Sequence, residues 1–321
     1  MKEIPITNIE NIRIGNAQDS EGATGCTVLL CEKGAPAGLD VRGGGPASRE
    51  SELLKPVAAC EAIHAVLLSG GSAFGLHAAG GVMQYLEEKE IGFDTGFARV
   101  PLVCASCLYD LGVGSPSARP TPEMAYQACL DAEKNQPAFG NAGAGTGASV
   151  GKLLGMEYAM KSGLGAYAVE VGPLQVGALV AVNALGDIFS PEGRRIAGLL
   201  NPNKDGMRGS LESMYTMLER PANLFAGNTT LGVILTNAKL TKTPLNKVAA
   251  MAHNGYARAI CPVHTSADGD SIYALSMGDV PANLDVVGTL AAEVMARAIE
   301  NAVLSAESAY GLPSAMSIAN N

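Results

Sequence analysis

The sequence predicts an α/β protein folded as one domain, with strands and helices in segregated layers and not in alternating strand–helix–strand units. Hydrophobic residues make up 47% of the 321 residues and charged residues only 17%, so the chain can bury a large core. Apolar runs typical of strands occur beside segments whose apolar residues have helical spacing. No repeat, low-complexity tract or linker divides residues 1–321, which favours a single domain.

The first half of the chain contains the signals of several strands and two helices. Strands are recognised by β-branched and apolar runs between turn residues, and helices by periodicity and by a cap such as Thr121 before Pro122. The expected elements are a hairpin at 11–31, a strand and glycine-rich turn at 35–46, a central strand at 63–68, a helix at 76–89, an extended stretch at 100–110 and a helix at 120–135.

The second half continues with strands that pair and helices that end the chain. Residues 191–226 have the weakest periodicity and are predicted to be a mobile surface segment leading to residue 228. The other expected elements are paired strands at 164–171 and 176–183, a strand after Thr229, a helix at 244–260 capped by Thr243, a strand at 271–277 and a helix at 283–306.

Composition and termini exclude several classes of partner. A net charge of −9 argues against nucleic acid, because phosphate binding needs clustered lysine and arginine. The first residues carry charges and a proline where a signal peptide has an apolar run, and no stretch reaches the ~20 apolar residues of a membrane helix. We therefore expect a cytoplasmic protein without a membrane partner. The seven scattered cysteines are predicted to be mostly buried small hydrophobic residues.

No motif for a cofactor or a metal ion passes inspection. The glycine run at 140–151 fails as a phosphate loop and as a dinucleotide fingerprint, and is predicted to be a turn of close backbone approach. The four histidines, His64, His77, His253 and His264, have no metal-ligand spacing. His253 is predicted to be a hydrogen-bonded structural histidine on an apolar helix. No cofactor and no metal are expected.

Thr229 begins the stretch with the most distinctive chemistry. Residues 227–237 read as a small-residue turn with two adjacent hydroxyls, followed by a buried strand. A cut before Thr229 would give it both a hydroxyl and a free α-amine that could act as its base, the N-terminal-threonine form of acyl-transfer catalysis. Taken alone, an ordinary turn entering a core strand is the simpler interpretation.

Two carboxylates form a second candidate. Asp268 and Asp270 lie two residues apart in a loop entering a strand, so an extended chain would direct them to one side. Two nearby acids could bind an ammonium group and set its protonation. Taken alone, the pair is more simply a solvated turn.

Five separated motifs resemble one family, the self-processing peptidases that include L-aminopeptidase/D-esterase, the β-peptidyl aminopeptidases and the nylon-oligomer hydrolases. The matching segments follow the family order and span most of the chain. They are Leu39-Asp40-Val41-Arg42-Gly43-Gly44, Leu68-Ser69-Gly70-Gly71-Ser72-Ala73-Phe74-Gly75-Leu76, Gly143-Ala144-Gly145-Thr146-Gly147, Gly227-Asn228-Thr229-Thr230 and the run from His264-Thr265 to Asp268-Gly269-Asp270.

The resemblance implies a four-layer αββα sandwich, like that of the Ntn hydrolases but with different connectivity. It implies self-cleavage between Asn228 and Thr229, which gives a long chain of residues 1–228 and a short chain of residues 229–321. By the same resemblance Thr229 is the nucleophile, and Asp268 and Asp270 hold the network of its amine and hydroxyl.

Three further residues gain roles from the resemblance. Asn183 matches the asparagine that helps bind the oxyanion, and Lys152 and Tyr109 resemble residues that line the nylon-hydrolase site. Lys161 is a second candidate for the lysine. Some aminopeptidase members place an acid shortly before the tyrosine. The run Cys107-Leu108-Tyr109 has no acid, so the substrate preference of those members is not expected to carry over to this chain.

The expected function is that of a self-cleaving amidohydrolase or aminopeptidase that forms an acyl-enzyme at Thr229. A nucleophile confined in a pocket suits small peptides, amides or esters, and the long apolar C-terminal helix with the family resemblance implies a homo-oligomer. Two alternatives stay open: an acyltransferase on a related fold, and an uncleaved, non-enzymatic protein that binds small molecules.

Overall fold

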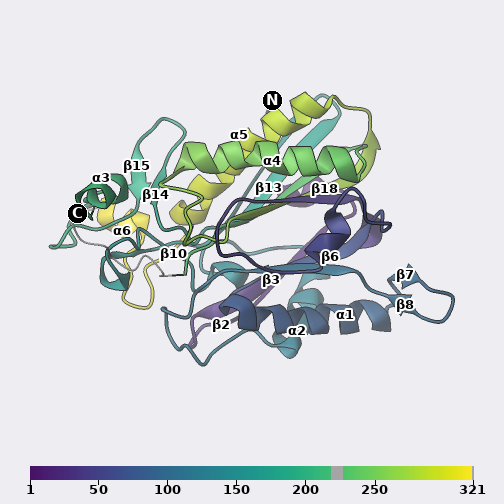
Figure 1. The fold of residues 1–321 in the computed structure, drawn as a ribbon, viewed down its shortest axis with the longest axis horizontal. Helices are drawn as coiled ribbons and strands as arrows, with labels where there is room; N and C mark the ends of the chain where they lie inside the picture. Colours follow the sequence, from purple (N-terminus) through teal and green to yellow (C-terminus); the bar gives the residue numbers. More distant parts are fainter. Residues whose placement is uncertain (218–226, 320–321) are drawn as a thin grey trace.

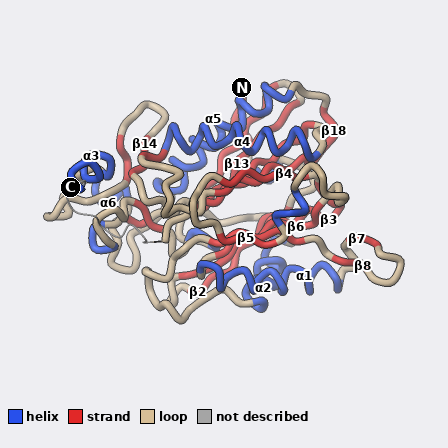
Figure 2. The backbone as a smooth tube through the Cα atoms, viewed as in Figure 1, coloured by secondary structure: helices blue, strands red, loops and turns tan. Residues whose placement is uncertain are grey.

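The computed structural model describes residues 1–217 and 227–319, and it has four layers (Figures 1 and 2). Two β-sheets stack face to face, and a pair of helices covers the outer face of each sheet. The predicted four-layer αββα sandwich is therefore confirmed. Three large apolar cores separate the layers: one lies between the two sheets, and one lies between each sheet and its helices.

The first sheet has six strands and is covered by the two long C-terminal helices. Its strand order is β1 (Lys2–Ile4), β12 (Leu164–Val171), β13 (Leu174–Ala181), β16 (Leu231–Ala238), β18 (Ser271–Val280) and β4 (Ala37–Val41). The covering helices are α4 (Lys242–Ala259) and α5 (Leu284–Leu304), which lie together on its outer face in Figure 1.

The second sheet has five strands and carries the shorter helices. Its order is β2 (Arg13–Asp19), β3 (Thr24–Ala35), β6 (Ile63–Ser69), β9 (Val103–Cys107) and β5 (Ala47–Arg49), with α1 (Ala79–Glu88) and α2 (Pro122–Ala132) outside it. The smaller elements are β7 (Phe93–Asp94) with β8 (Arg99–Val100), β10 (Ser149–Val150) with β11 (Met160–Lys161), β14 (Asp187–Phe189) between β15 (Arg195–Ala197) and β17 (Ile260–Cys261), α3 (Ser210–Thr216) and α6 (Ala315–Ala319).

The alternation of side chains along β16 shows why its sequence forms a central strand. Leu231, Val233 and Leu235 point into the core between the sheets, whereas Ile234 packs in the core beneath α4 and α5. Successive side chains of a strand face opposite sides, so a strand buried on both faces is apolar throughout. Each fully buried side chain of this size contributes about 1.5–3 kcal/mol relative to an exposed one.

The register of three central strands of the first sheet places the candidate residues together, at the same end of these strands. β16 runs parallel to β18, with Leu231 opposite Ser271, and antiparallel to β13, with Leu231 opposite Ala181. The residues just before β16 and β18 and just after β13 are therefore neighbours. These are the positions of Thr229, Asp270 and Asn183.

Most predicted elements are observed, and the helix starts needed correction. The chain forms a 3-10 helix at Ser72–Ala78 before α1 begins at Ala79, three residues later than predicted. Two successive left-handed residues, Gly71 and Ser72, introduce this tighter turn. α4 begins at Lys242 after Thr241, so Thr243 lies inside the helix and is not its cap.

The prediction of a mobile surface segment at 191–226 missed the regular and buried structure at 195–200 and 210–216, whereas residues 191–194 and 202–205 are exposed as predicted. Residues 218–226 lie outside the described part of the chain. Residues 195–197 and 210–216 form β15 and α3, and Ala197, Leu199 and Leu200 are buried. The buried carboxylate of Asp187 accepts hydrogen bonds from the backbone N–H of Leu199 and from the backbone N–H and the hydroxyl of Ser210. Tertiary contacts to Asp187 and burial of apolar side chains thus hold a segment whose own periodicity is weak.

The structure also confirms three predictions for single residue types. Five of the seven cysteines are buried, whereas Cys60 and Cys261 are half-buried. His253 is fully buried with Nε2 3.1 Å from the Asp40 carbonyl oxygen, which confirms a structural histidine. Gly145 packs directly against the backbone of β12, as expected for a turn of close approach.

Candidate active site

Thr229 lies buried at the start of β16, with its hydroxyl against the peptide bond that precedes it. Its Oγ1 donates a hydrogen bond to the carbonyl oxygen of Asn228, and its backbone N–H donates to the carbonyl oxygen of Asn183 at 2.9 Å. Asn228 and Thr229 are 1% and 3% exposed. The hydroxyl is therefore shielded from bulk water and held beside the carbonyl group of residue 228.

Gly269 supplies a second contact to the same carbonyl group. Its backbone N–H donates to the Asn228 oxygen at 3.0 Å. A Cβ atom on residue 269 would lie 2.6 Å from Oγ1 of Thr229, so this position must remain a glycine. The carbonyl group of residue 228 thus accepts two hydrogen bonds, one from the neighbouring hydroxyl and one from the 268–270 loop.

Asn183 connects Thr229 to Lys152 and Tyr109. Its side-chain Oδ1 accepts from Lys152 Nζ at 2.8 Å and from the Ser149 backbone at 3.1 Å, and its Nδ2 donates to the Tyr109 carbonyl oxygen at 2.8 Å. These contacts fix which end of the amide is oxygen and which is nitrogen. Because Nδ2 has two hydrogens, one N–H remains beyond the bond to Tyr109.

Lys152 is buried, and its environment favours the neutral amine. Desolvation lowers the pKa of Lys152 to about 7, although the nearby carboxylates of Asp268, Asp110 and Asp270 act in the opposite direction. Burial penalises the charged form of a lysine, whereas neighbouring negative charges stabilise it. Nζ also lies 3.1 Å from the Asn183 carbonyl oxygen. The amine therefore sits at the balance point between its charged and neutral forms near neutral pH.

Asp268 is a buried acid held by its own loop. Oδ2 accepts from the Thr265 hydroxyl at 2.5 Å and from the Thr265 backbone at 2.9 Å. Desolvation, reinforced by the charge of Asp270, raises the pKa of Asp268 to about 6, while Thr265 and Lys152 favour its ionised form. Asp268 and Lys152 thus titrate near each other in one buried cluster.

Asp270 contacts the chain directly after the nucleophile candidate. Its Oδ1 accepts from the Thr230 backbone at 2.8 Å, and its Oδ2 lies 2.8 Å from Nδ1 of His264. The buried carboxylate therefore joins the start of β16 to the loop before β18. Sequence reasoning did not single out His264 as a partner of Asp270, although the residue opens the motif that ends with this acid.

Lys161, the alternative lysine, lies in a different environment. Its Nζ donates to the carbonyl oxygens of Gly145 at 2.9 Å and Ala148 at 3.1 Å, and to that of Ser162. Lys152, and not Lys161, is hydrogen-bonded to Asn183. The remaining sequence-predicted residue, Tyr109, is 38% exposed and its ring lies against Gly227. The structure thus gathers all seven predicted residues, Asn183, Asn228, Thr229, Asp268, Asp270, Lys152 and Tyr109, in one cluster.

Asp110 is a buried acid next to Tyr109 that sequence reasoning also missed. Its carboxylate accepts from the Thr24 hydroxyl and from the Gly71 backbone, both at 2.7 Å. Burial raises the pKa of Asp110 above its usual range, and these hydrogen bonds oppose that shift. The carboxylate anchors the Tyr109 segment to the glycine turn after β6, which in turn sets the position of the carbonyl group that Asn183 contacts.

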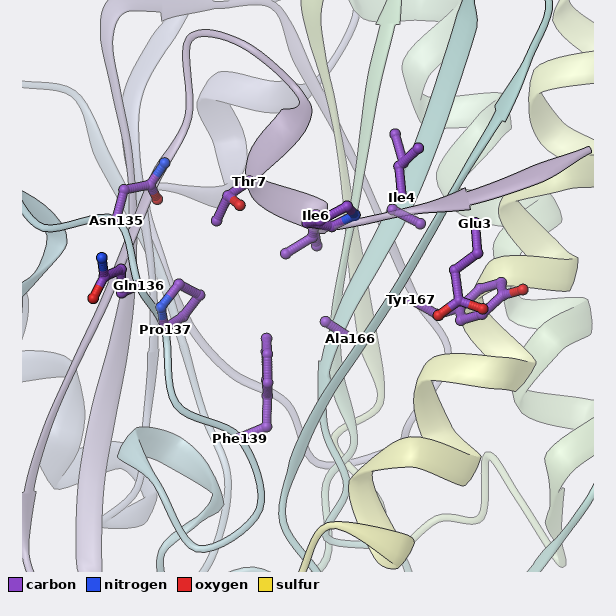
Figure 3. A pocket seen from close by; sticks show the side chains of 12 residues that line it. Glu3, Ile4, Ile6, Thr7, Asn135, Gln136, Pro137, Phe139, Ala166 and Tyr167 are labelled. Carbon is purple, nitrogen blue, oxygen red and sulfur yellow. The ribbon is translucent and has the colours of Figure 1, made fainter.

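A large hollow elsewhere on the surface does not contain this cluster (Figure 3). It has a volume of about 780 Å³ and is lined by residues of β1, by Ala166 and Tyr167 of β12 and by the segment from Asn135 to Phe139. None of the seven predicted residues lines it. The hollow and the cluster are therefore separate features of the molecule.

Metal ligands and membrane spans can be judged over residues 1–217 and 227–319. In those ranges no group of three or more His, Cys, Asp and Glu side chains is arranged to hold a metal ion. In the same ranges no helix has the length and apolar character needed to cross a membrane.

Comparison with solved structures shows which proteins share this fold. The fold is similar to that of a Burkholderia sp. β-aminopeptidase, with a TM-score of 0.69, 18% identity and coverage of 98% of this chain and 91% of the other. It is also similar to the L-aminopeptidase D-Ala-esterase/amidase of Ochrobactrum anthropi, with a TM-score of 0.68, 18% identity and coverage of 94% and 86%. The latter structure is described as a new variant of the Ntn hydrolase fold.

The sequence comparison then gives the family. The profile of peptidase family S58 matches residues 5–316, and the chain belongs to that family. An uncharacterized aminopeptidase of Mycobacterium leprae is 37% identical over 96% of this chain and 92% of its own length. A 6-aminohexanoate-oligomer endohydrolase of Kocuria sp. is 30% identical over 88% of this chain and 81% of its own length. The protein is therefore a hydrolase of the S58 peptidases, as the sequence motifs predicted.

Proposed function

We propose that the chain cleaves its own peptide bond between Asn228 and Thr229, and that the freed Thr229 then hydrolyses small peptides, amides or esters. The observation that carries this proposal is the arrangement around the 228–229 bond. The Thr229 hydroxyl and the Gly269 N–H both contact the Asn228 carbonyl oxygen, in a buried site with an amine and two carboxylates.

Self-cleavage would begin with attack of Thr229 Oγ1 on the Asn228 carbonyl carbon. The hydroxyl loses its proton, the carbon–nitrogen bond breaks, and the Thr229 nitrogen takes up a proton, so an ester replaces the amide. Water then hydrolyses the ester to an Asn228 carboxylate and a free Thr229 hydroxyl. The Gly269 N–H, already 3.0 Å from the carbonyl oxygen, is placed to stabilise the oxyanion of the first step.

The mature reaction would use the α-amine released by cleavage. A terminal amine has a reference pKa of about 7.7–8.0, and its neutral form can accept the proton of the Thr229 hydroxyl. The charges of Asp268 and Asp270 favour its ammonium form and raise that pKa, whereas burial opposes them. The second N–H of Asn183 Nδ2 is the proposed donor to the oxyanion of the substrate, a contact worth about 3–4 kcal/mol in comparable sites.

Lys152 is proposed to hold the Asn183 amide and to balance the charge of the cluster. Its Nζ contacts Oδ1, which turns Nδ2 toward Tyr109 and the space beside Thr229. With a pKa of about 7, its charge state changes with small shifts of pH. Tyr109 is proposed to line the substrate site, since its exposed ring borders Gly227 at the approach to Thr229.

The class of substrate follows from the family relatives and from the buried nucleophile. Relatives are named aminopeptidases and 6-aminohexanoate-oligomer endohydrolases, and both names describe the cleavage of amide bonds. We further propose that the two pieces stay in one unit after cleavage, because β13 and β16 pair in the same sheet, and that protomers associate as a homo-oligomer. The burial of Thr229, which is 3% exposed, supports small substrates over proteins.

The proposal is tested by trapping the acyl-enzyme. Purified protein is mixed with an amino-acid p-nitroanilide or with a 6-aminohexanoate oligomer and quenched in acid within one turnover. The mass of the 229–321 piece should rise by that of the acyl group, and tandem fragmentation should place the addition on Thr229. Thr229→Ser should retain turnover, and Thr229→Ala should lose it. An acyl group on any other residue, or turnover by Thr229→Ala, would refute the assignment.

A further inference from the structure

His264 is the side chain that holds the second oxygen of Asp270. Its ring Nδ1 lies 2.8 Å from Oδ2 and its backbone N–H lies 3.2 Å from the same atom. The other oxygen, Oδ1, accepts the Thr230 N–H at 2.8 Å. Asp270 is thus clamped between His264 on one side and the residue after Thr229 on the other.

The His264 ring is itself fixed from behind. It packs against His253, with the ring centroids 4.7 Å apart, and it stacks on Tyr256 at 5.9 Å. His253 is bonded through Nε2 to the carbonyl oxygen of Asp40 on β4, so it cannot turn freely. The chain of contacts therefore runs from the edge strand of the sheet through two imidazole rings to Asp270.

The hydrogen bond to Asp270 determines which imidazole nitrogen carries the proton. An ionised carboxylate only accepts hydrogen bonds, so Nδ1 must be the donor. Nε2 of His264 is buried and has no hydrogen-bond partner among the residues that the structure describes. A neutral ring protonated on Nδ1 satisfies both observations, because its Nε2 then has no hydrogen to donate.

The backbone at His264 is in the left-handed region, with φ at 56°. Glycine adopts this conformation without cost, and asparagine does so far more readily than most residues. Asparagine also places an amide nitrogen three bonds from Cα, the same separation as Nδ1 in histidine. Glycine and asparagine at position 264 can therefore both keep this backbone conformation. Glycine removes the side-chain donor to Asp270, whereas asparagine retains one.

We propose that His264 is a positioning residue of the Thr229 site, which acts by holding Oδ2 of Asp270 so that Oδ1 stays on the Thr230 N–H. This inference rests on the proposed function and adds to it a residue that does not touch the substrate. Without the clamp, the carboxylate would rotate, and both the start of β16 and the negative charge beside Thr229 would lose their fixed places.

The pH profile distinguishes this role from simple packing. Asp270 faces Asp268, Lys152 and the Tyr256 hydroxyl, and His264 faces the ring of His253. Asp40 and Arg42 lie behind the two rings, and both affect His253. A held Asp270 charge raises the pKa of the Thr229 amine, so release of the carboxylate should move the acid limb of kcat/KM to lower pH.

The experiment compares His264→Gly with His264→Asn in the full-length, self-cleaved enzyme. His264→Gly loses the ring donor and keeps only the backbone N–H that lies 3.2 Å from Oδ2. It should lower kcat/KM by about 10- to 100-fold, the effect of one hydrogen bond to a charged group, and shift the acid limb to lower pH. His264→Asn keeps a donor and should stay close to the wild type in rate and in acid limb. The extent of self-cleavage is measured by intact mass before each assay.

Each outcome decides the inference. Wild-type rate and acid limb in His264→Gly would overturn it, and so would an His264→Asn enzyme as impaired as His264→Gly. If His264→Gly does not fold, the behaviour of His264→Asn alone decides. Failure of the wild type to cleave, or cleavage of Thr229→Ala, would instead remove the proposed function on which the inference rests.

Discussion

Two buried lysines with the same protonation tendency occupy very different surroundings. Desolvation lowers the pKa of both Lys152 and Lys161 to about 7. Lys161 is surrounded by three backbone carbonyl oxygens, those of Gly145, Ala148 and Ser162. Lys152 contacts Asn183 and lies in the electrostatic field of three carboxylates. The same burial thus serves a structural role in one place and a proposed catalytic role in the other.

The two lysines differ in the hydrogen-bond acceptors that would lose a donor if the amine were removed. Around Lys161, the Gly145 and Ala148 oxygens keep backbone donors, the N–H groups of Ala148 at 3.2 Å and Ser162 at 3.0 Å. Within the described part of the chain the Ser162 oxygen has no such second donor, and a buried acceptor without a partner costs about 1–3 kcal/mol. The acceptors around Lys152 keep other donors: Asn183 O still accepts from Thr229, and its Oδ1 still accepts from Ser149. A perturbed pKa therefore identifies a buried lysine but does not say what it does.

The largest expected effect is on the activity of Lys152→Met. Loss of Nζ frees the Asn183 amide, and misplacement of one oxyanion donor typically costs about 10²- to 10³-fold in kcat. The measurement is kcat on a p-nitroanilide, normalised to the fraction of self-cleaved chains. Lys161→Met is the matched control and should keep the wild-type kcat per cleaved molecule; equal losses in the two variants would contradict the assignment.

The next effect is on stability, and here Lys161→Met should have a larger effect than Lys152→Met. In the uncleaved Thr229→Ala background near pH 10, where the penalty for burying either amine has disappeared, Lys161→Met should lower the free energy of unfolding by about 1–3 kcal/mol, since the Ser162 oxygen loses its donor. Lys152→Met should change it by less than about 1 kcal/mol. Urea unfolding followed by circular dichroism gives both values. A larger loss for Lys152→Met would reverse the comparison.

A smaller effect, shared by the two lysines, is the dependence of stability on pH. Folding depresses a lysine pKa from about 10.4 to about 7, so between these values the unfolded chain binds one more proton per lysine than the folded chain. The penalty is complete below pH 7 and disappears as pH rises toward 10. Each lysine therefore adds about 1.4 kcal/mol of stability per pH unit in this window.

Substitution of either lysine by methionine should remove that slope. Unfolding free energies of the Thr229→Ala protein and of its Lys152→Met derivative are compared between pH 7.5 and 9.5, where other groups titrate alike in both. The difference between the two proteins should change by about 1.4 kcal/mol per pH unit. A constant difference would mean that Lys152 is charged in the folded chain throughout this range.

Local sequence patterns predicted an α/β chain with strands and helices in segregated layers, and the family resemblance added the four-layer αββα order. Thr229 and the pair Asp268 and Asp270 could be singled out because their side chains carry chemistry just before apolar strands, whereas Asn183 was identified through the family resemblance. Neighbouring strands then bring such positions to one edge. The family motifs added the roles that those positions are proposed to have.

The other features depend on contacts between segments far apart in the chain. Lys152 and Lys161 both occur among small and apolar residues, and only their partners in the folded chain separate them. Asp187 holds the chain at Leu199 and Ser210, and the role inferred for His264 depends on the placement of Asp270. Periodicity and turn composition record neither kind of contact.

The central claim is tested most directly by the intact masses of the wild type, Thr229→Ala and Thr230→Ala under denaturing conditions. The account predicts two pieces for the wild type, residues 1–228 and 229–321, and a single chain of 321 residues for Thr229→Ala. Thr230→Ala should cleave like the wild type, because its hydroxyl takes no part in the reaction. Cleavage of Thr229→Ala at the same bond, or a wild type that stays whole, would contradict the account.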